Sequence, residues 1–314
     1  MFLLPRNHPG LASSLIDLLR AYGGHSEHQL RALLIPPNLW RGDEPEGQSK
    51  TPAAVGSFND TLKALLDAGA LKHADGHVQL TRPFATHLGS AAVADRLALW
   101  LLDEERTGTD PCSSEGAQGA TGDLAHSLTW FLQLDPLGPW TQVSARSAEL
   151  SPVARLQEET GRSLPADTFK NPSDWSLFVR WSTYLGFGEL RPGGRLDPDP
   201  TVAIGRVLDE VLPEEMSLST FLGGLGASVP MFGGHLERSW HGSTTPTLQG
   251  TVPPSLANAL LRLEHAGCLR LDTGVDEDDI VVLEFGRFAP VEGPEGVIRP
   301  TQRRYARVRP EVAA

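Results

Sequence analysis

The sequence predicts a mainly α-helical protein with small β-hairpins, in which two winged helix-turn-helix modules flank a helical middle domain. Three observations support this fold class. A motif of spaced leucines, an Ala-Gly pair and a basic end occurs twice, at residues 62–72 and 260–270. Short apolar segments of strand length follow each copy, and amphipathic segments of helix length precede each copy. The predicted domains are residues 1–84, 85–213 and 214–314.

Each copy of the motif is predicted to be a helix that ends at a glycine. Leucines three positions apart, such as Leu62 and Leu65, place an apolar stripe on one helix face. Gly69 and Gly267 follow the helices, where a left-handed conformation favours the residue that lacks a Cβ. The alternative is chance recurrence, because helix ends of this kind are also common in α/β proteins.

A hairpin is predicted after each helix. In the first copy, residues 70–72 pair with residues 78–80 across a turn that contains Asp75-Gly76, a strong signal for a two-residue turn. In the second copy, residues 269–271 are expected to pair with residues 280–283 across an acidic loop. Helix, glycine, strand, turn and strand form the last third of a winged helix.

The two earlier helices of each module are expected before the motif. Ser26 and Gln29 have the spacing of a capping box, which marks a helix start. The four predicted helices are residues 11–22 and 26–34 before the first copy, and residues 218–225 and 230–240 before the second. Polar segments rich in Gly, Pro and Ser are predicted to be loops at residues 36–53 and 107–121.

The middle third is predicted to be a helical domain. Apolar faces indicate helices within residues 85–105, 122–134 and 198–212, one that starts near residue 151, and one over residues 171–185. A small hairpin is expected between residues 187–190 and 195–196. The tryptophans of this third are core candidates because aromatics at helical spacing usually pack in the interior; they are Trp100, Trp130, Trp175 and Trp181.

The charge balance is acidic. The chain has 27 lysines and arginines against 39 aspartates and glutamates, a net charge of −12. Proteins that grip phosphate backbones take most of their affinity from basic surface, so this balance favours basic protein partners over nucleic acid.

Two cysteines are too few for a disulfide framework, and the sequence shows no signal peptide or apolar run of about 20 residues. A cytoplasmic protein without a membrane partner is expected.

The sequence contains no recognisable catalytic motif. Cys112 and Cys268 lack the partners of a zinc site, and His25 with His28 lacks further ligands. The glycines near residues 223–226 do not fit the phosphate-binding loop, which ends in Gly-Lys-Ser or Gly-Lys-Thr. We therefore expect no metal, no cofactor and no enzymatic activity. A nuclease or hydrolase with a scattered site is a minor alternative.

If the modules bind DNA, the helix of each motif should enter the major groove. The candidate contacts lie on these helices, on the strands after them and in the basic tail: Asn59, Lys63, Lys72, Asn258, Arg262, Arg270, Arg303, Arg304 and Arg307. Each helix offers only one cation, Lys63 or Arg262, although phosphate clamps are needed there, so docking of protein partners is favoured. The tail is predicted to be a strand or extended arm, whose arginines bind phosphates or else discourage pairing of edge strands.

Several motifs together resemble the DpdG family. They are Trp175 with Phe178-Val179-Arg180-Trp181 and Leu185-Gly186-Phe187, then residues 199–204, then Leu218, Phe221-Leu222, Val229-Pro230 and Gly233-Gly234. The N-terminal module is similar as well, so the likeness covers most of the chain. The resemblance implies an accessory, non-enzymatic subunit of the bacterial system that inserts 7-deazaguanine derivatives into DNA and restricts unmodified DNA. It implies helicase and nuclease subunits as partners and supplies no catalytic residue.

A second resemblance is to the acidic kite-type subunits of SMC complexes, which also carry winged helices at both ends. Those subunits lack a helical insert as large as residues 89–212, which places this interpretation second. The leading hypothesis is a non-catalytic adaptor of a DNA-modification-linked anti-phage complex that docks protein partners and, as a further candidate, double-stranded DNA. The other hypothesis is a winged-helix transcriptional regulator that binds duplex DNA.

Overall fold

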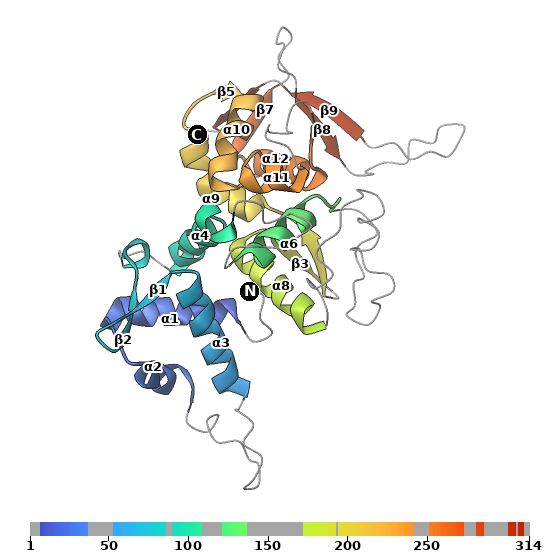
Figure 1. Ribbon diagram of the computed structural model, residues 1–314. Helices are drawn as coiled ribbons and strands as arrows, with labels where there is room; N and C mark the ends of the chain where they lie inside the picture. The colour runs from blue at the N-terminus through green and yellow to red at the C-terminus, as the bar shows by residue number, and fades with distance from the viewer. Residues whose placement is uncertain are drawn as a thin grey trace.

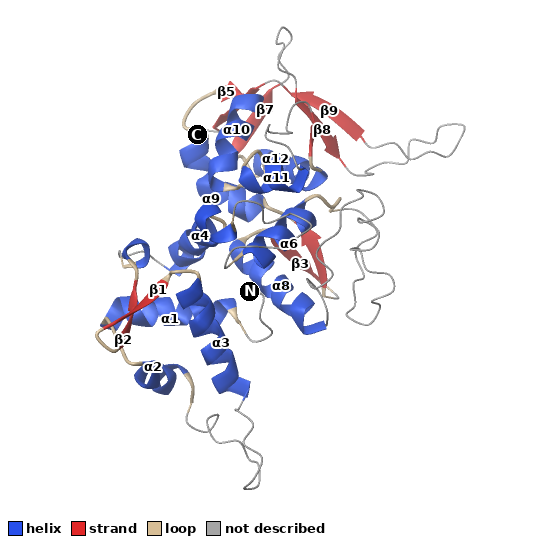
Figure 2. Cartoon of the chain, in the orientation of Figure 1, coloured by secondary structure: helices blue, strands red, loops and turns tan. Residues whose placement is uncertain are grey.

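The computed structural model describes residues 7–36, 53–85, 90–108, 121–136, 172–192, 194–241, 251–272, 281–285, 301–305 and 307–310. Helices predominate, and the strands form small sheets at separate places in the molecule (Figure 2). The N-terminal elements lie at the lower left in Figure 1, the C-terminal sheets lie at the top, and α4, α6 and α8 lie between them.

The N-terminal unit contains the helices and the hairpin that the sequence predicts. Its elements are α1 (Pro9–Tyr22), α2 (Glu27–Leu34), α3 (Ala53–Asp67), β1 (Leu71–Ala74) and β2 (His77–Leu80), followed by the short 3-10 helix η2 (Arg82–Phe84). Ser26 and Gln29 form the predicted capping box at the start of α2. A backbone bridge joins His25 to Val78, so β2 lies between His25 and β1.

The first hairpin forms where it is predicted, with the two-residue turn at Asp75-Gly76. Leu71 lies opposite Leu80 and Ala74 opposite His77, which leaves a two-residue turn at Asp75-Gly76. These turn residues have φ values of 53° and 74°. Positive φ at both positions is the requirement of the type I′ turn that matches the twist of two antiparallel strands.

The middle part is helical with one hairpin, as predicted. Its elements are α4 (Ser90–Leu101), α5 (Glu104–Thr107), α6 (Gly122–Leu132), α8 (Pro172–Leu185), β3 (Gly188–Arg191) and β4 (Arg195–Pro198). Asp103 divides the helix predicted within residues 85–105, because its carboxylate caps the first turn of α5. The helix predicted near residue 151 and most of the loops predicted at residues 36–53 and 107–121 lie outside the described residues.

The C-terminal part carries the remaining helices and two small sheets. Its elements are α9 (Thr201–Val211), β5 (Met216–Ser217), α10 (Leu218–Ser228), α11 (His235–His241), β6 (Thr251–Val252), α12 (Pro254–His265), β7 (Leu269–Asp272), β8 (Val281–Phe285), β9 (Thr301–Tyr305) and β10 (Arg307–Pro310). Within the described residues one sheet has the order β5-β10-β7, and the other has the order β6-β8-β9. The predicted tail strand is therefore two strands, β9 and β10.

The predicted pairing of residues 269–271 with residues 280–283 is wrong. β7 pairs with β10, where Val308 lies opposite Leu271, and β8 pairs with β6 and β9. The pattern of residues explains this outcome. Alternating Arg-Val-Arg in β10 buries Val308 fully beside the core, as a strand with one buried face requires. The apolar run Val281-Val282-Leu283 in β8 is typical of a central strand, and β8 has a neighbour on each side.

The two motif helices end in the same way. The capping glycines have φ values of 73° and 71°. After each glycine, the next backbone N–H donates to a carbonyl five residues back, from Ala70 to Leu65 and from Cys268 to Leu263, both at 2.9 Å. The sequence repeat therefore corresponds to a repeated helix end, in which the left-handed glycine lets two backbone groups close the last turn.

One hydrophobic core runs through the described part of all three regions. Trp130 and Trp181 are fully buried, whereas Trp100 and Trp175 pack against the core and stay partly exposed. The rings of Phe131 and Phe178 meet edge to face, with centroids 5.3 Å apart. The predicted placement of the four tryptophans near the core is confirmed.

The loop that follows α10 folds back onto that helix. A Cβ added at Gly226 would lie 2.5 Å from the backbone carbon of Gly233, and one added at Gly234 would lie 2.4 Å from the Gly226 carbonyl oxygen. Only glycine permits this approach of two backbones. Gly223, on the same helix, is different, because an added Cβ there would meet nothing within 4 Å.

These contacts predict opposite effects for two alanine substitutions in one helix. Gly226→Ala forces the backbones apart and is expected to lower the free energy of unfolding by about 1–3 kcal/mol. Gly223→Ala meets no atoms and reduces the flexibility of the unfolded chain, so it is expected to raise that free energy by up to about 1 kcal/mol. Urea denaturation followed by circular dichroism measures both. Equal effects of the two substitutions would contradict the packing described here.

Candidate functional site

The outer face of α3 is exposed. Asn59, Lys63 and Asp67 follow one another at intervals of four residues and therefore lie on one side of the helix, and all three are exposed. The other side is buried in the core through residues such as Phe58 and Leu62. α3 thus presents two of the predicted contact residues to solvent, together with an aspartate that the prediction did not include.

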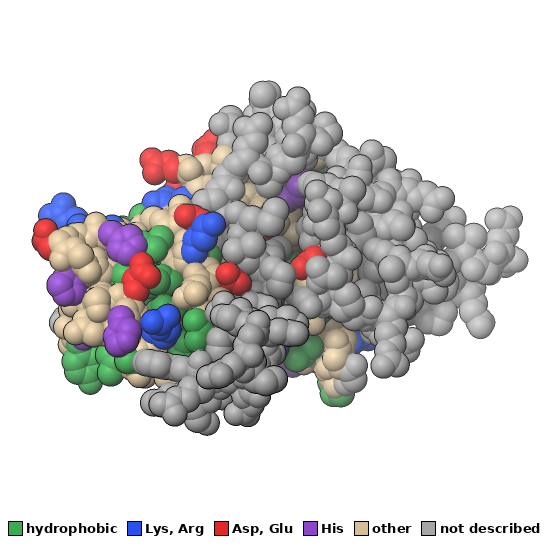
Figure 3. Space-filling model, turned by 60° about the horizontal axis from the view of Figure 1, so that its bottom comes forward, with side chains coloured by type: hydrophobic (Ala, Val, Ile, Leu, Met, Phe, Trp, Pro, Cys, Tyr) green, Lys and Arg blue, Asp and Glu red, His purple; other side chains and the backbone are tan. Residues whose placement is uncertain are grey.

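The hairpin β1–β2, which follows α3, also carries exposed polar side chains. Lys72, His73 and His77 are exposed on it, and the His73 ring lies 3.4 Å from the carboxylate of Glu27 on α2. Figure 3 shows basic, acidic and histidine side chains interspersed on the face of the molecule that it draws. Among the described side chains in that view no continuous basic patch forms, so the surface lacks the charge pattern that favours a phosphate backbone.

Arg262 of the second motif helix forms ion pairs with other side chains of the same chain. Its Nη1 lies 2.7 Å from Glu189 Oε2 on β3 and also donates to Asp199 Oδ2. Asp199 is only 7% exposed. Its other oxygen accepts from the Thr201 hydroxyl and, at 3.0 Å, from the Thr201 backbone N–H. A single carboxylate therefore joins the end of β4, the start of α9 and the last turn of α12.

The ion pairs continue along the hairpin β3–β4. Arg191 lies 2.8 Å from Glu189 and 3.2 Å from Asp197, and Asp197 also pairs with Arg195. Burial raises the pKa of the Glu189 carboxyl, but the hydrogen bond and the charge of Arg262 outweigh burial and lower its pKa below the ordinary value. The hydrogen bond that Arg262 donates to Glu189 raises the pKa of Arg262. Both groups are therefore held in their charged forms.

The rest of α12 is also packed against the molecule. Ser255 is buried and donates to the carbonyl of Leu132 at the end of α6. Asn258 is half-buried.

The remaining predicted contact residues lie on strands. Arg270, on β7, is exposed and lies 3.2 Å from Asp272. The backbone of Arg303 and Arg304 lies in β9, and that of Arg307 lies in β10.

The structure therefore divides the predicted contact residues between two ends of the molecule. Asn59, Lys63 and Lys72 lie in the N-terminal unit, and the others lie on α12, β7, β9 and β10 at the opposite end (Figure 1). Sequence reasoning missed Asp199 and Glu189. An aspartate before Pro200-Thr201 is a signal for a helix start, but no local pattern indicates its pairing with α12.

These features define a mainly helical protein with an exposed helix at one end and a closed ion-pair network near the other. No three histidine, cysteine or acidic residues come together as metal ligands in the part of the chain described. In the same part, no helix combines the length and the apolar character that crossing a membrane requires.

A comparison with protein-family models finds that the DpdG-like family matches residues 3–277. The chain belongs to the DpdG-like family, which confirms the resemblance seen in the sequence. Membership suggests an accessory protein of the Dpd system, a defence-related system of several proteins. Comparisons with curated proteins and with solved structures find no match.

The ion pair between Arg262 and Asp199 predicts a measurable loss of stability. Arg262→Met leaves the nearly buried Asp199 carboxylate without its cationic partner, and we expect the free energy of unfolding to fall by about 1–3 kcal/mol, since Arg262 itself is partly exposed. The control is Arg270→Met, which breaks an exposed pair and should change that free energy by less than about 0.5 kcal/mol. Urea denaturation compares the two, and similar losses would argue against a special role for Asp199.

The lowered pKa of Glu189 predicts a pH dependence. A carboxyl whose pKa is lower in the folded state adds stability above its ordinary pKa of 4.5, and that contribution disappears as the pH falls through the folded-state pKa. The difference in unfolding free energy between the unmodified protein and Arg262→Met should therefore be constant between about pH 5 and 7 and shrink below about pH 4. A difference that grows on acidification would contradict this assignment.

Proposed function

We propose that this protein is a non-catalytic docking subunit of a DNA-modification-linked defence complex. Its two ends act as winged-helix modules, and the exposed N-terminal module binds a protein partner of the helicase or nuclease type. The observation that carries the proposal is the difference between the two motif helices: α3 presents Asn59 and Lys63 to solvent, whereas Arg262 of α12 is bound to Glu189 and Asp199.

The order of strands in both units supports winged-helix modules. In a winged helix, a short strand before the second helix lies beside the last strand of the hairpin. In the N-terminal unit, His25 precedes α2 and bridges to β2, which pairs with β1. In the C-terminal unit, β5 precedes α10 and lies beside β10, which pairs with β7. α9 packs against α10 and α12, so the C-terminal module that we propose begins at α9, earlier than residue 214.

The charge of the exposed helix supports a protein partner. Lys63 lies between Asp60 and Asp67 in the sequence of α3, and this part of the helix has one positive and two negative side chains. A helix that reads DNA needs cations to hold it against the phosphates. With a net charge of −12, the chain is better suited to a partner with a basic surface.

Co-purification tests the docking role. The full-length protein is expected to copurify with a helicase- or nuclease-type subunit encoded by a neighbouring gene. The double substitution Asn59→Arg/Lys63→Glu changes size and charge on the exposed face of α3, and the apparent affinity should fall by about tenfold or more. The matched control is Arg270→Glu, an exposed charge reversal in the C-terminal unit, which should leave binding unchanged.

Two outcomes would overturn this assignment. One is a protein that copurifies with none of these subunits. The other is a complex that the α3 substitutions leave intact and Arg270→Glu disrupts, since the partner would then bind the other end of the molecule.

Duplex DNA is the alternative ligand of the N-terminal unit, because Lys72 on β1, the strand that follows α3, is a second exposed cation. Fluorescence anisotropy with a labelled duplex at two salt concentrations separates the alternatives. Binding through phosphates weakens steeply with salt, with a slope of about −0.9 for each phosphate contact. Steeply salt-dependent binding that Lys63→Glu abolishes would favour DNA, and weak binding that Lys63→Glu leaves unchanged would favour the protein partner.

A further inference from the structure

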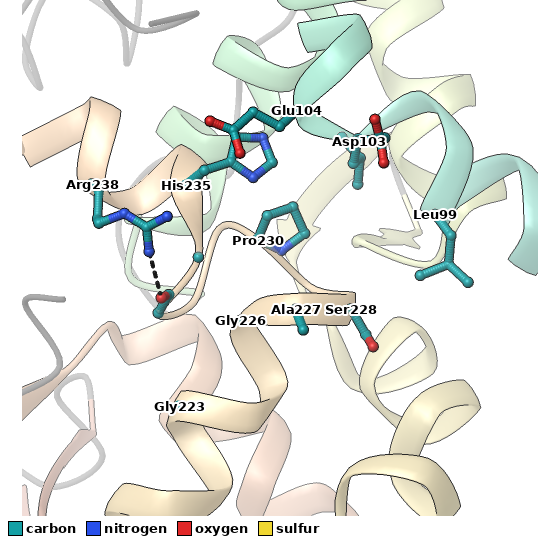
Figure 4. Close-up of a pocket in the computed structure, with 13 residues that line it drawn as sticks. Leu99, Asp103, Glu104, Gly223, Gly226, Ala227, Ser228, Pro230, His235 and Arg238 are labelled. Atoms are coloured by element: carbon teal, nitrogen blue, oxygen red, sulfur yellow. Dashed lines mark hydrogen bonds between the residues drawn. The ribbon is translucent and has the colours of Figure 1, made fainter. Parts of the chain in front are cut away.

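A cleft of about 450 Å³ lies between the end of α4 with the start of α5 and the segment from α10 to α11 (Figure 4). Pockets that hold small molecules have volumes of roughly 300–1,000 Å³. Leu99, Leu102, Asp103 and Glu104 form one wall. The opposite wall comes from a part of the chain more than one hundred positions later, so only the tertiary fold creates the cleft.

A glycine in this wall is not explained by packing. Gly226 and Gly234 allow two backbones to approach closely, but a Cβ at Gly223 would meet no atom within 4 Å. Glycine is a poor choice inside an α-helix such as α10 when no contact requires it. Gly223 lines the cleft, so the missing side chain leaves the space open. Its neighbour Gly224 also meets nothing and does not line the cleft, and nothing in the structure explains it.

Arg238 lines the cleft with an incompletely satisfied charge. It is half-buried, and its Nη1 donates to the Gly233 carbonyl at the long distance of 3.4 Å (Figure 4). Among the described residues no carboxylate lies within ion-pair distance of this guanidinium. The half-buried guanidinium has no counter-charge among these residues, and a bound oxyanion would supply one together with two charge-assisted hydrogen bonds.

His235 adds a second nitrogen-bearing side chain beside Arg238. Its Nε2 lies 3.1 Å from Thr107 Oγ1, and the Thr107 hydroxyl lies 3.2 Å from the Asp103 carbonyl oxygen, to which it donates. A hydroxyl has a single proton, so we assign the imidazole proton to Nε2, which leaves Nδ1 free of this contact. Burial lowers the pKa of His235. An anion bound nearby would stabilise the protonated ring.

The wall that contains Asp103 and Glu104 limits the charge of a ligand. The Asp103 carboxylate is neutralised by Arg106 at 3.1 Å and accepts from the Glu105 backbone N–H at 3.0 Å. Glu104 is exposed, and Figure 4 draws its carboxylate beside the His235 ring. This carboxylate disfavours a highly charged anion and accepts hydrogen bonds. A compact molecule with one oxyanion and one hydrogen-bond donor matches both walls.

We propose that this cleft binds a small molecule whose carboxylate or phosphate group is held by Arg238 and whose hydrogen-bond donor faces Glu104. Gly223 keeps the volume of the site open. The site is separate from the exposed face of α3, so the two functions can be tested independently.

The test titrates the full-length protein with acetate and, separately, with inorganic phosphate at millimolar concentration, and sodium chloride keeps the ionic strength constant. The unfolding temperature of the unmodified protein should rise and saturate with one or both anions. A response to acetate alone identifies a carboxylate ligand, a response to phosphate alone identifies a phosphate ligand, and both responses identify a general oxyanion site.

Two variants and a matched control locate the binding. Arg238→Gln should weaken binding by about tenfold or more through loss of the charge-assisted hydrogen bonds. Gly223→Leu should abolish binding by filling the cleft, and it provides an independent test if Arg238→Gln fails to fold. Gly224→Leu introduces the same side chain at the next position of α10 and should bind as the unmodified protein does. The proposal is overturned if neither anion binds, or if binding persists in Gly223→Leu.

Discussion

The hydrogen-bonded ion pair between Arg262 and Asp199 is the constraint on which the arrangement of the C-terminal half depends. A carboxylate that is 7% exposed is stable in its charged form only if both oxygens have partners. One oxygen of Asp199 bonds Thr201 at the start of α9, and the other bonds Arg262 on α12. The same residue therefore starts one helix and orients another, which turns the side of α12 that carries Arg262 toward the hairpin β3–β4.

Besides the shared core, polar contacts at the end of α3 join the N-terminal unit to α4 and α5. The carbonyl of Ala68 accepts from Trp100 Nε1 and from Arg106 Nε, both at 3.0 Å. The Arg106 guanidinium lies over the Trp100 ring, 3.2 Å from its centroid. A cation at the C-terminal end of a helix also interacts favourably with the helix dipole. These contacts secure one end of α3 and leave its outer face uncovered by the described elements, which is the geometry of a surface that receives a partner.

Local patterns in the sequence predict the helices and the first hairpin, because capping, turn and periodicity signals act over a few residues. Ser26 with Gln29 and Asp75 with Gly76 are examples in which the side chains themselves specify the backbone conformation. Contacts between distant segments have no comparable signal. Its place on the second motif helix makes Arg262 a candidate DNA contact, but no local pattern indicates its ion pair with Asp199, which is 63 positions away in the chain. The pairing of β7 with β10 was missed for the same reason, since the nearer apolar run in β8 has the stronger local strand pattern.

The match to the DpdG-like family ends at residue 277, but the C-terminal sheet does not. β10 comes after that position and lies between β5 and β7, which both lie within the matched region. Its Val308 is fully buried in the core, and without it the apolar side of β7 at Leu271 would lose the neighbour that covers it. The residues after 277 therefore supply the central strand of a sheet whose edge strands belong to the family region. A closed C-terminal unit, with α12 held against the body of the molecule, depends on both parts of the chain.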